Sequence, residues 1–276
     1  MRSRWVALLA LVAALSLVAA ACGDDGTDEG GANGGGAGPT VPTLEEGVLL
    51  IGSDIPYPPF EYREGGTEVG FDMDLIREIA DRLGLEVRIV DTDFATIFTQ
   101  LSTARFDVVI AASTITPKRE ESVNFSIPYY NSQQSLTVQA GSGISTVEDL
   151  QQGMVVGVQK RTTGEAWALE NVPEGVEVRS FPEGPDGYTA LEAGQVDAVI
   201  NDEPVAIAEI ANREGLELAE TIPTGEAYGI AVNPANAELL AAVNDTLEEI
   251  VADGTYDAIY AKYGDLPPGG SIAASD

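Results

Sequence analysis

Two segments of the chain place small polar or acidic residues directly after an apolar strand. Residues 101–110 (LSTARFDVVI) and 191–200 (LEAGQVDAVI) share a helix end, a turn and a buried strand at the same spacing. Residues 112–114 (Ala-Ser-Thr) follow the first, and residues 201–203 (Asn-Asp-Glu) follow the second. Open parallel sheets bind ligands beyond the carboxyl ends of their strands. Two such sheets facing each other would present both polar groups, which can hydrogen-bond a ligand, on opposite walls of one cleft. A chance similarity of two helix–strand units explains the pattern equally well, so the pattern alone leaves both interpretations open.

The composition excludes several kinds of catalytic and metal site. The 276 residues include no histidine and one cysteine, which rules out a Ser-His-Asp triad, a Cys-His dyad, an imidazole zinc site and an internal disulfide. No GxGxxG, GxxxxGK[ST] or GxSxG motif occurs. The segment that begins at Asp91 fails as an EF-hand loop, because Ala95 and Thr96 occupy the positions of a ligand and of the glycine. We therefore expect no catalytic residue, no metal and no cofactor.

The charge and the apolar content narrow the class of protein further. A formal net charge of −31 would repel a phosphate backbone, so no nucleic acid is expected as a partner. The hydrophobic fraction of 44% is that of a globular protein. The length suits one or two domains with a substantial core.

The elements that must hold the polar residues alternate between strands and helices. Strand-like and helix-like runs follow one another at residues 48–52, 74–83, 85–90, 94–103, 107–111, 154–158, 163–170, 176–180, 187–193, 196–200 and 204–213. Such alternation, with helices of about ten residues, predicts parallel sheets in an α/β architecture.

The first residues have the pattern of a targeting segment. Arg2 and Arg4 precede an apolar stretch, and small residues lead into Cys22. The sequence Ala-Ala-Ala-Cys resembles a bacterial lipobox, and Cys22 is the only cysteine. We therefore predict a lipoprotein signal peptide at residues 1–21 and lipidation of Cys22, which would anchor the protein to the outer face of the cell membrane.

Two alternatives for this segment stay open. A lipobox usually has leucine where Ala19 stands, so ordinary signal-peptidase cleavage after Ala21 is one of them. The other is an uncleaved membrane anchor, for which the stretch is short, since a spanning helix needs about 20 apolar residues.

Two further segments have linker composition. Residues 22–43 begin with a run rich in glycine and aspartate that cannot bury a core, so they predict a flexible tether. The short Gly/Ser-rich end of the chain, residues 265–276, predicts a flexible tail.

Six segments of the body resemble the solute-binding proteins of polar amino-acid ABC importers, known as family 3. The resemblance covers almost all of residues 44–264 and keeps the order of the family's motifs. The matching segments are residues 53–61 (SDIPYPPFE), 69–75 (VGFDMDL), 106–111 (FDVVIA), 114–119 (TITPKR), 124–130 (NFSIPYY) and 196–202 (VDAVIND).

The resemblance implies a type II periplasmic-binding-protein fold, in which a two-strand hinge joins two α/β lobes and the ligand lies in the cleft between them. Lobe 1 would comprise residues 44–132 and 227–264, and lobe 2 residues 133–226. The chain would cross between the lobes at residues 133–138 and 225–232. Proteins of this kind close over their ligand by bending at the hinge.

The resemblance also implies how the carboxylate of an α-amino acid is bound. Arg119, in the sequence Thr-Pro-Lys-Arg, matches the family's bidentate arginine. Thr162 and Thr163 match a pair at a helix start, where free amides and hydroxyls face an anion. An arginine on a helix surface and simple helix capping are the alternative interpretations. The family commonly has glycine before the threonine pair, whereas this chain has Arg161.

The ammonium and the side chain of the ligand have matching positions too. Asp202 matches the family's carboxylate for the ammonium, with the Thr114 hydroxyl and the Ala112 carbonyl as further contacts. Tyr57 and Phe94 match the aromatic rings that enclose the ligand side chain. The alternatives are helix capping for Asp202 and a core position for each aromatic ring.

The identity of the amino acid is less constrained. Asp54 lies where relatives that bind cationic side chains have an acid, and Glu61 and Gln159 could assist it. Lys160 and Arg161 would instead suit an acidic ligand. We expect a polar or basic amino acid.

These observations predict an extracytoplasmic, monomeric binding protein without enzymatic activity that delivers an amino acid to an ABC permease by hinge closure. Some relatives are extracytoplasmic dehydratases of the cyclohexadienyl type, which makes an enzyme on the same scaffold the first alternative. A lipoprotein that senses its ligand by touching a partner is the second.

Overall fold

The computed structural model of the chain describes residues 41–264 and 266–272, which all belong to one compact unit. The predicted signal peptide, Cys22 and the predicted tether up to residue 40 lie outside the described residues. In the part of the chain that is described, no helix is long and apolar enough to cross a membrane.

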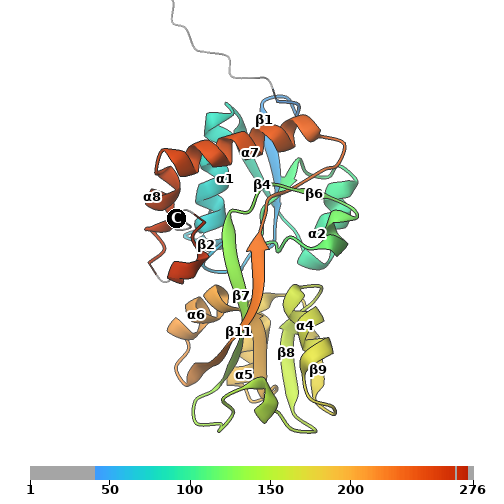
Figure 1. The fold of residues 1–276 in the computed structure, drawn as a ribbon, viewed down its shortest axis with the longest axis vertical. Helices are drawn as coiled ribbons and strands as arrows, with labels where there is room; N and C mark the ends of the chain where they lie inside the picture. Colours follow the sequence, from blue (N-terminus) through green and yellow to red (C-terminus); the bar gives the residue numbers. More distant parts are fainter. Residues whose placement is uncertain (1–40, 265, 273–276) are drawn as a thin grey trace, which may run out of the picture. The chain divides into compact units, whose positions relative to one another are not determined.

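Lobe 1 is built around a five-stranded sheet with the strand order β4-β1-β5-β12-β6. Its strands are β1 (Val48–Ser53), β4 (Glu86–Asp91), β5 (Val108–Val109), β6 (Asn124–Phe125) and β12 (Ala231–Val232). Its helices are α1 (Phe71–Arg82), α2 (Phe94–Ser102), α3 (Pro117–Glu120), α7 (Ala237–Ala252) and α8 (Thr255–Tyr260), and a small hairpin comprises β2 (Tyr62–Glu64) and β3 (Thr67–Val69). Five of the six residues of β1 are buried, as expected for an apolar strand covered on both faces. Figure 1 shows α1, α2 and α7 around this sheet.

Lobe 2 is built around a second five-stranded sheet with the order β11-β7-β10-β8-β9. Its strands are β7 (Tyr130–Gln139), β8 (Val155–Gln159), β9 (Glu177–Phe181), β10 (Ala198–Asp202) and β11 (Leu216–Tyr228). Its helices are α4 (Thr163–Asn171), α5 (Gly184–Glu192) and α6 (Glu203–Ala211), with one 3-10 turn, η1 (Val147–Asp149).

Both sheets are mixed, which corrects the prediction of parallel sheets. The pairs of β1 with β4 and β5, and of β8 with β9 and β10, are parallel. In contrast, β12 runs antiparallel to β5 and β6, and β7 runs antiparallel to β10 and β11. The antiparallel strands lie where the chain passes between lobes without a helical crossover, and a parallel pair requires such a crossover.

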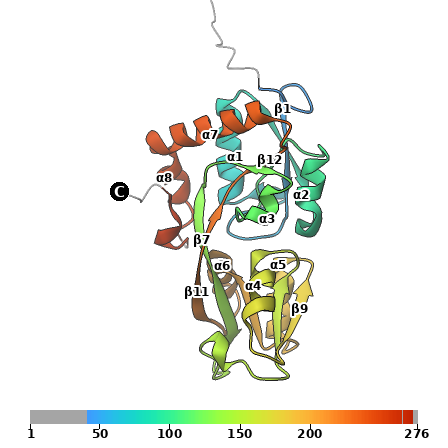
Figure 2. The ribbon, with the colours of Figure 1, turned by 45° about the vertical axis from the view of Figure 1, so that its right-hand side comes forward.

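Two strands carry the chain between the lobes. The chain enters β7 directly after β6 of the first sheet, and it leaves β11 directly before β12 of the same sheet. β7 and β11 pair with each other from Tyr130↔Tyr228 to Gln139↔Leu216, and Figures 1 and 2 show them side by side between the lobes. The exact lobe boundaries given by the sequence remain a prediction.

The two similar sequence segments make the same hydrogen bonds in the two lobes. Asp107 precedes β5 and accepts the N–H of Leu50 on β1 at 2.8 Å. Asp197 precedes β10 and accepts the N–H of Val155 on β8 at 2.7 Å. In both lobes this acid fixes the start of a strand against its parallel neighbour. Chance similarity therefore does not explain the pattern.

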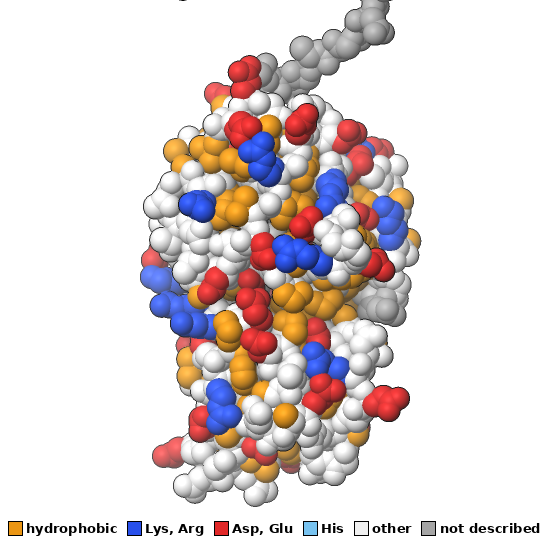
Figure 3. All heavy atoms as spheres, turned by 180° about the vertical axis from the view of Figure 1, so that it is seen from behind, with side chains coloured by type: hydrophobic (Ala, Val, Ile, Leu, Met, Phe, Trp, Pro, Cys, Tyr) orange, Lys and Arg blue, Asp and Glu red, His pale blue; other side chains and the backbone are white. Residues whose placement is uncertain are grey.

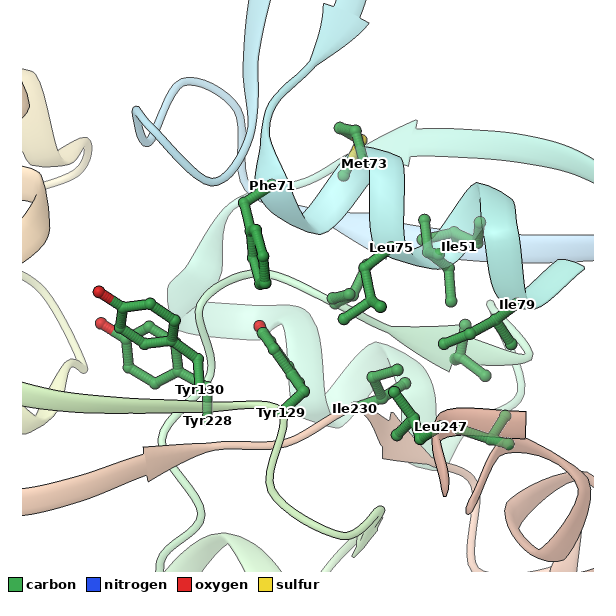
Figure 4. Close-up of a cluster of buried hydrophobic side chains, with 14 of the residues drawn as sticks. Ile51, Phe71, Met73, Leu75, Ile79, Tyr129, Tyr130, Tyr228, Ile230 and Leu247 are labelled. Carbon is green, nitrogen blue, oxygen red and sulfur yellow. The ribbon is translucent and has the colours of Figure 1, made fainter. Parts of the chain in front are cut away.

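An aromatic cluster supports the lobe 1 ends of the two crossing strands. Tyr130 and Tyr228 stack with their ring centroids 5.4 Å apart, and Phe71 meets Tyr130 at 6.0 Å. Tyr129 packs on Phe71, and Figure 4 shows these four rings together beside α1. All four side chains are fully buried, so the crossing begins from a rigid, apolar base.

The end of the chain departs from the predicted flexible tail over residues 266–272. Leu266 is buried in the lobe 1 core, and residues 268–270 form a 3-10 turn, η2 (Pro268–Gly270). The Tyr260 hydroxyl donates to the Pro267 carbonyl. Gly270 lies so close to the Tyr130 ring that an added Cβ would overlap it. The apolar contacts of Leu266 and Tyr130 hold a segment whose composition alone indicates a linker.

This contact gives a prediction with a matched control. We expect Gly270→Ala to lower the free energy of unfolding by about 1–3 kcal/mol, because the methyl group must displace a fully buried ring. Gly269→Ala places its methyl group in open space and should leave stability nearly unchanged. Urea denaturation of both variants measures the difference. Equal stabilities would mean that the segment does not pack on Tyr130.

Candidate functional site

One cavity is lined by residues of both lobes and includes all nine positions singled out from the sequence. It encloses about 290 Å³ of atom-free space, counting the part open to solvent. The residues that line it are Asp54, Tyr57, Glu61, Phe94, Ala111, Ala112, Thr114, Arg119, Gln159, Thr162, Thr163 and Asp202. Their role in binding stays a prediction, whereas their convergence is observed.

Arg119 is held at one side of the cavity by α3. Thr116 caps this short helix by accepting the Arg119 N–H at 3.2 Å, and Pro117 occupies the first turn. The guanidinium donates to the Thr114 carbonyl at 2.6 Å and to the Arg161 carbonyl at 3.5 Å. Its carbon lies 5.1 Å from the centroid of the Phe94 ring and 4.9 Å from that of Phe98.

The Arg119 guanidinium is charged but has no acidic partner. Among the residues that the structure describes, none of the ion pairs includes Arg119. Burial lowers its pKa to about 10, so the group keeps its proton at neutral pH. Of its five N–H donors, two are engaged, and the rest can receive an anion.

The start of α4 forms the lobe 2 side of the cavity. Thr162 caps the helix by accepting the Glu165 N–H at 3.1 Å, and its hydroxyl donates to the Gln159 carbonyl at 2.7 Å. The Thr163 hydroxyl donates to Glu226 at 2.8 Å. Neither hydroxyl proton is therefore free to bind an anion. If Thr162 and Thr163 bind the ligand carboxylate as predicted, they do so through the backbone amides of the first helical turn.

Arg161, at the position where the resemblance described above implies a glycine, adopts a left-handed backbone with φ of 66°. Glycine reaches this region without steric cost, which is the physical reason for the usual residue. The Arg161 N–H donates to Glu165 at 2.7 Å, and its side chain is exposed instead of entering the cavity.

Asp202 ends β10 and is 5% exposed. It accepts hydrogen bonds from the Tyr57 hydroxyl at 3.0 Å, from Gln134 Nε2 at 2.5 Å and from the Tyr228 hydroxyl. Its side chain makes no capping hydrogen bond to α6, so the capping alternative does not hold. Burial, and secondly the charge of Glu226, raise its pKa from 3.8 to about 7.

Ala112 and Thr114 follow β5 on the lobe 1 side. Ala112 has a left-handed backbone with φ of 42°, and its N–H donates to the buried Asp72 carboxylate at 2.8 Å. The Thr114 hydroxyl donates to Glu226 at 2.6 Å.

The two aromatic positions have polar neighbours as well as apolar ones. The Tyr57 hydroxyl, which has one proton, lies 2.7 Å from Asn201 Oδ1 and 3.0 Å from Asp202 Oδ2, and a hydrogen bond to either joins lobe 1 to lobe 2. An added Cβ at Gly184 would lie 3.0 Å from the Tyr57 ring, so glycine permits this approach. The Phe94 ring packs against the Arg119 guanidinium.

A second acid, Asp54, lines the cavity, and Glu183 lies near it without lining the cavity. Asp54 is buried and accepts Gln159 Nε2 at 2.7 Å. Burial, followed by the charge of Glu183, raises the pKa of Asp54 to about 7. The buried Oε2 atom of Glu183 has no hydrogen-bond partner.

A second pair of buried carboxyl groups lies in lobe 1, where Glu61 lines the cavity and Asp72 does not. Glu61 is 0% exposed and neither of its carboxyl oxygens makes a hydrogen bond of good geometry. Burial, and secondly the nearby Asp72 carboxylate, raise the pKa of Glu61 well above its ordinary value. Asp72 accepts the Tyr129 hydroxyl at 2.8 Å, and burial raises its pKa to about 6.

Two residues that the sequence did not single out contact the site. Gln134 on β7 donates from Nε2 to Asp202 and, at 3.0 Å, to Glu226 on β11. The sequence signal for Glu226 is the turn-like Pro-Thr-Gly at residues 223–225, which interrupts an otherwise strand-like segment and indicates a bulge.

Two α/β lobes line one cavity, and its walls present a buried carboxylate and a guanidinium that forms no ion pair with a described acid; this arrangement defines a two-lobed solute-binding protein. The model of the bacterial extracellular solute-binding proteins, family 3, matches residues 49–265, and the chain belongs to that family.

Named relatives agree with this assignment. The chain is 35% identical over 227 residues to the L-cystine-binding protein TcyJ of Escherichia coli strain K12, covering 79% of this chain and 83% of that protein. The solved structure of an ancestral arginine-binding protein bound to arginine has a TM-score of 0.75 to this fold and is 39% identical, covering 79% of this chain and 98% of that one. The ancestral amino acid-binding protein AncCDT-1, described as a precursor of cyclohexadienyl dehydratase, has a TM-score of 0.73 and 35% identity over 79% of this chain and 95% of that one.

Proposed function

We propose that the protein binds a polar or basic L-amino acid outside the cytoplasm and delivers it to the permease of an ABC importer. One observation carries the proposal: the same cavity presents the unpaired guanidinium of Arg119 and the buried carboxylate of Asp202. An α-amino acid brings one carboxylate and one ammonium. Burying either ion without a partner costs several kcal/mol, so a site that offers one partner for each suits this ligand class.

The polar contacts support specific roles for the lining residues. Arg119 and the amides at the start of α4 would bind the carboxylate. Asp202, the Thr114 hydroxyl and the Ala112 carbonyl would bind the ammonium. The rings of Tyr57 and Phe94 would enclose the ligand side chain.

The acidic end of the cavity supports a basic side chain on the ligand. Asp54 lines the cavity, Glu183 lies close enough to raise the pKa of Asp54, and no cation among the described residues forms an ion pair with either acid. Lys160 and Arg161, which would suit an acidic ligand, are exposed and do not line the cavity. The relative solved with arginine agrees with this preference.

Hydrogen bonds between the lobes support a closure mechanism. Gln159 of lobe 2 reaches Asp54 of lobe 1, and Tyr57 of lobe 1 reaches Asn201 of lobe 2. A ligand that contacts both walls would favour the closed form by its differential affinity for that form. The two crossing strands, β7 and β11, would act as the hinge, with lobe 1 at residues 44–132 and 227–264.

The proposal includes a place in the cell and a state of assembly. Lipidation at Cys22 would anchor a monomer to the outer face of the membrane, within reach of its permease. Acidic and basic side chains are interspersed over the face shown in Figure 3, and surface charges are screened beyond about 8 Å. Ligand choice should therefore depend on the cavity and not on the net charge.

A panel of the twenty L-amino acids in a thermal-shift assay tests the proposal. A ligand at 100 times its Kd should stabilise the protein by about 2.7 kcal/mol. We expect the largest shift from arginine or another basic amino acid. If no amino acid changes the melting temperature or gives heat in calorimetry, the proposed function is wrong.

A dehydratase of the cyclohexadienyl type is a second candidate, favoured by one observation. Glu61 lines the cavity and its pKa is raised well above the ordinary value, so it can retain a proton as a general acid must. We nevertheless propose a protein without catalytic activity, because the Arg119 and Asp202 groups suit recognition of an intact zwitterion. Incubation with a cyclohexadienyl amino acid, followed by chromatography, should give no product.

A further inference from the structure

Glu226 lies on the crossing strand β11, at the point where its pairing with β7 changes register. Ile222 pairs with Gln134 and Glu226 pairs with Ser132, so four steps along β11 match two along β7. Gly225, with φ of 65°, allows the backbone to make this bulge. A bulge of this kind redirects the side chain that follows it.

The Glu226 carboxylate binds hydroxyl groups from both lobes. Its Oε2 atom accepts the Thr114 hydroxyl of lobe 1 at 2.6 Å and the Thr163 hydroxyl of lobe 2 at 2.8 Å. Its Oε1 atom accepts Gln134 Nε2 at 3.0 Å. Thr114 and Thr163 both line the cavity, whereas Glu226 stands behind them.

This arrangement fixes what the two threonines can offer to a ligand. A hydroxyl has one proton to donate and two lone pairs that accept. Because both protons point to Glu226, only lone pairs remain for the cavity. Lone pairs suit an ammonium and do not suit a carboxylate, so Glu226 determines which charged group of the ligand these hydroxyls can bind.

Glu226 also adds negative charge next to Asp202. Gln134 Nε2 joins it to Asp202, and within residues 41–264 and 266–272 no cation forms an ion pair with either acid. The Arg119 charge acts on both acids without forming an ion pair with either, so the two neighbouring carboxylates still favour the arrival of a second cation.

We propose that Glu226 is a positioning residue of the ammonium subsite: it orients the Thr114 and Thr163 hydroxyls as acceptors and, with Asp202, supplies the negative charge that attracts the ligand ammonium. This proposal rests on the proposed amino-acid binding. It adds to that function a residue that does not itself line the cavity.

The test compares L-arginine with δ-guanidinovalerate, which is arginine without its α-ammonium group. Calorimetry gives the Kd of each for the wild type, Glu226→Gln and Glu226→Ala. Glu226→Gln keeps an oxygen acceptor but removes the charge, and Glu217→Gln is the control, because Glu217 is exposed on the same strand. The melting temperature of each unliganded variant reports on folding.

We expect Glu226→Gln to weaken arginine binding by about tenfold and to change δ-guanidinovalerate binding less than threefold, roughly the effect of one charged hydrogen bond. Glu226→Ala should weaken arginine binding further, and Glu217→Gln should change neither Kd. An equal loss of affinity for both probes would mean that Glu226 only supports lobe closure. Unchanged affinity for arginine would mean that Glu226 has no role in binding. Either result overturns this inference and leaves the proposed amino-acid binding intact. If the wild type binds no amino acid at all, the proposed function fails, and this inference fails with it.

Discussion

Replacement of Arg119 by alanine should weaken amino-acid binding by about 100-fold to 1,000-fold, since the ligand carboxylate would be buried without its charged partner. The fold already holds the Arg119 side chain in position for this role. Two backbone carbonyls and two aromatic rings hold the guanidinium, and no described acid neutralises it. Little reorganisation is therefore needed when a carboxylate arrives. Isothermal titration calorimetry with L-arginine measures the effect.

Two further variants separate charge from geometry at this position. Arg119→Lys keeps the positive charge but loses the planar fork and the contact with two rings, and we expect it to lose about tenfold in affinity or more. Lys118→Ala removes the neighbouring cation, which is exposed and pairs with Glu121, and should bind as the wild type does. An Arg119→Ala protein that folds and still binds within threefold of the wild type would exclude Arg119 from the site.

The sequence could predict the position of the site because its strongest signals are local. An acid, an apolar strand and a polar strand end recur in both lobes, and each unit is decided by neighbouring residues. The structure adds that Asp107 and Asp197 make equivalent bonds, which explains why the spacing is equal in the two segments. The roles of Arg119, Asp54 and the aromatic rings came from the family resemblance and not from such patterns.

Other features of the site depend on distant parts of the chain, and no local pattern could reveal them. Glu226 reaches Thr114, 112 positions away, only because a bulge shifts its register. Glu61 and Asp72 lie on either side of the β2–β3 hairpin and become a buried pair because the start of α1 packs against residues 59 and 60. The direction of the Thr163 hydroxyl depends on Glu226, so the sequence could not tell whether this hydroxyl would donate to an anion or accept from a cation.

The raised pKa values connect ligand binding to protons. Without ligand, Asp202 and Asp54 hold protons up to about pH 7, because burial disfavours their charged forms. In the unfolded chain the same carboxyl groups have the ordinary aspartate pKa of 3.8 and lose their protons near that pH. Between these values the native state binds more protons than the unfolded state, so the stability of the unliganded protein should fall as pH rises from 4 to 7.

Ligand affinity should depend on pH in the opposite direction. An ammonium beside Asp202 favours the charged carboxylate, so binding releases a proton below pH 7 and affinity should rise by about tenfold per pH unit up to that value. A basic side chain beside Asp54 would release a second proton and steepen the rise.

The variant Asp202→Asn removes one titrating group. It should weaken binding by about 100-fold and abolish the part of the pH dependence that comes from Asp202. Calorimetry at pH 5.5, 6.5 and 7.5, in buffers of different ionisation heat, counts the protons directly. An affinity that is constant over this range in the wild type, or a slope that Asp202→Asn leaves unchanged, would show that Asp202 does not meet the ammonium.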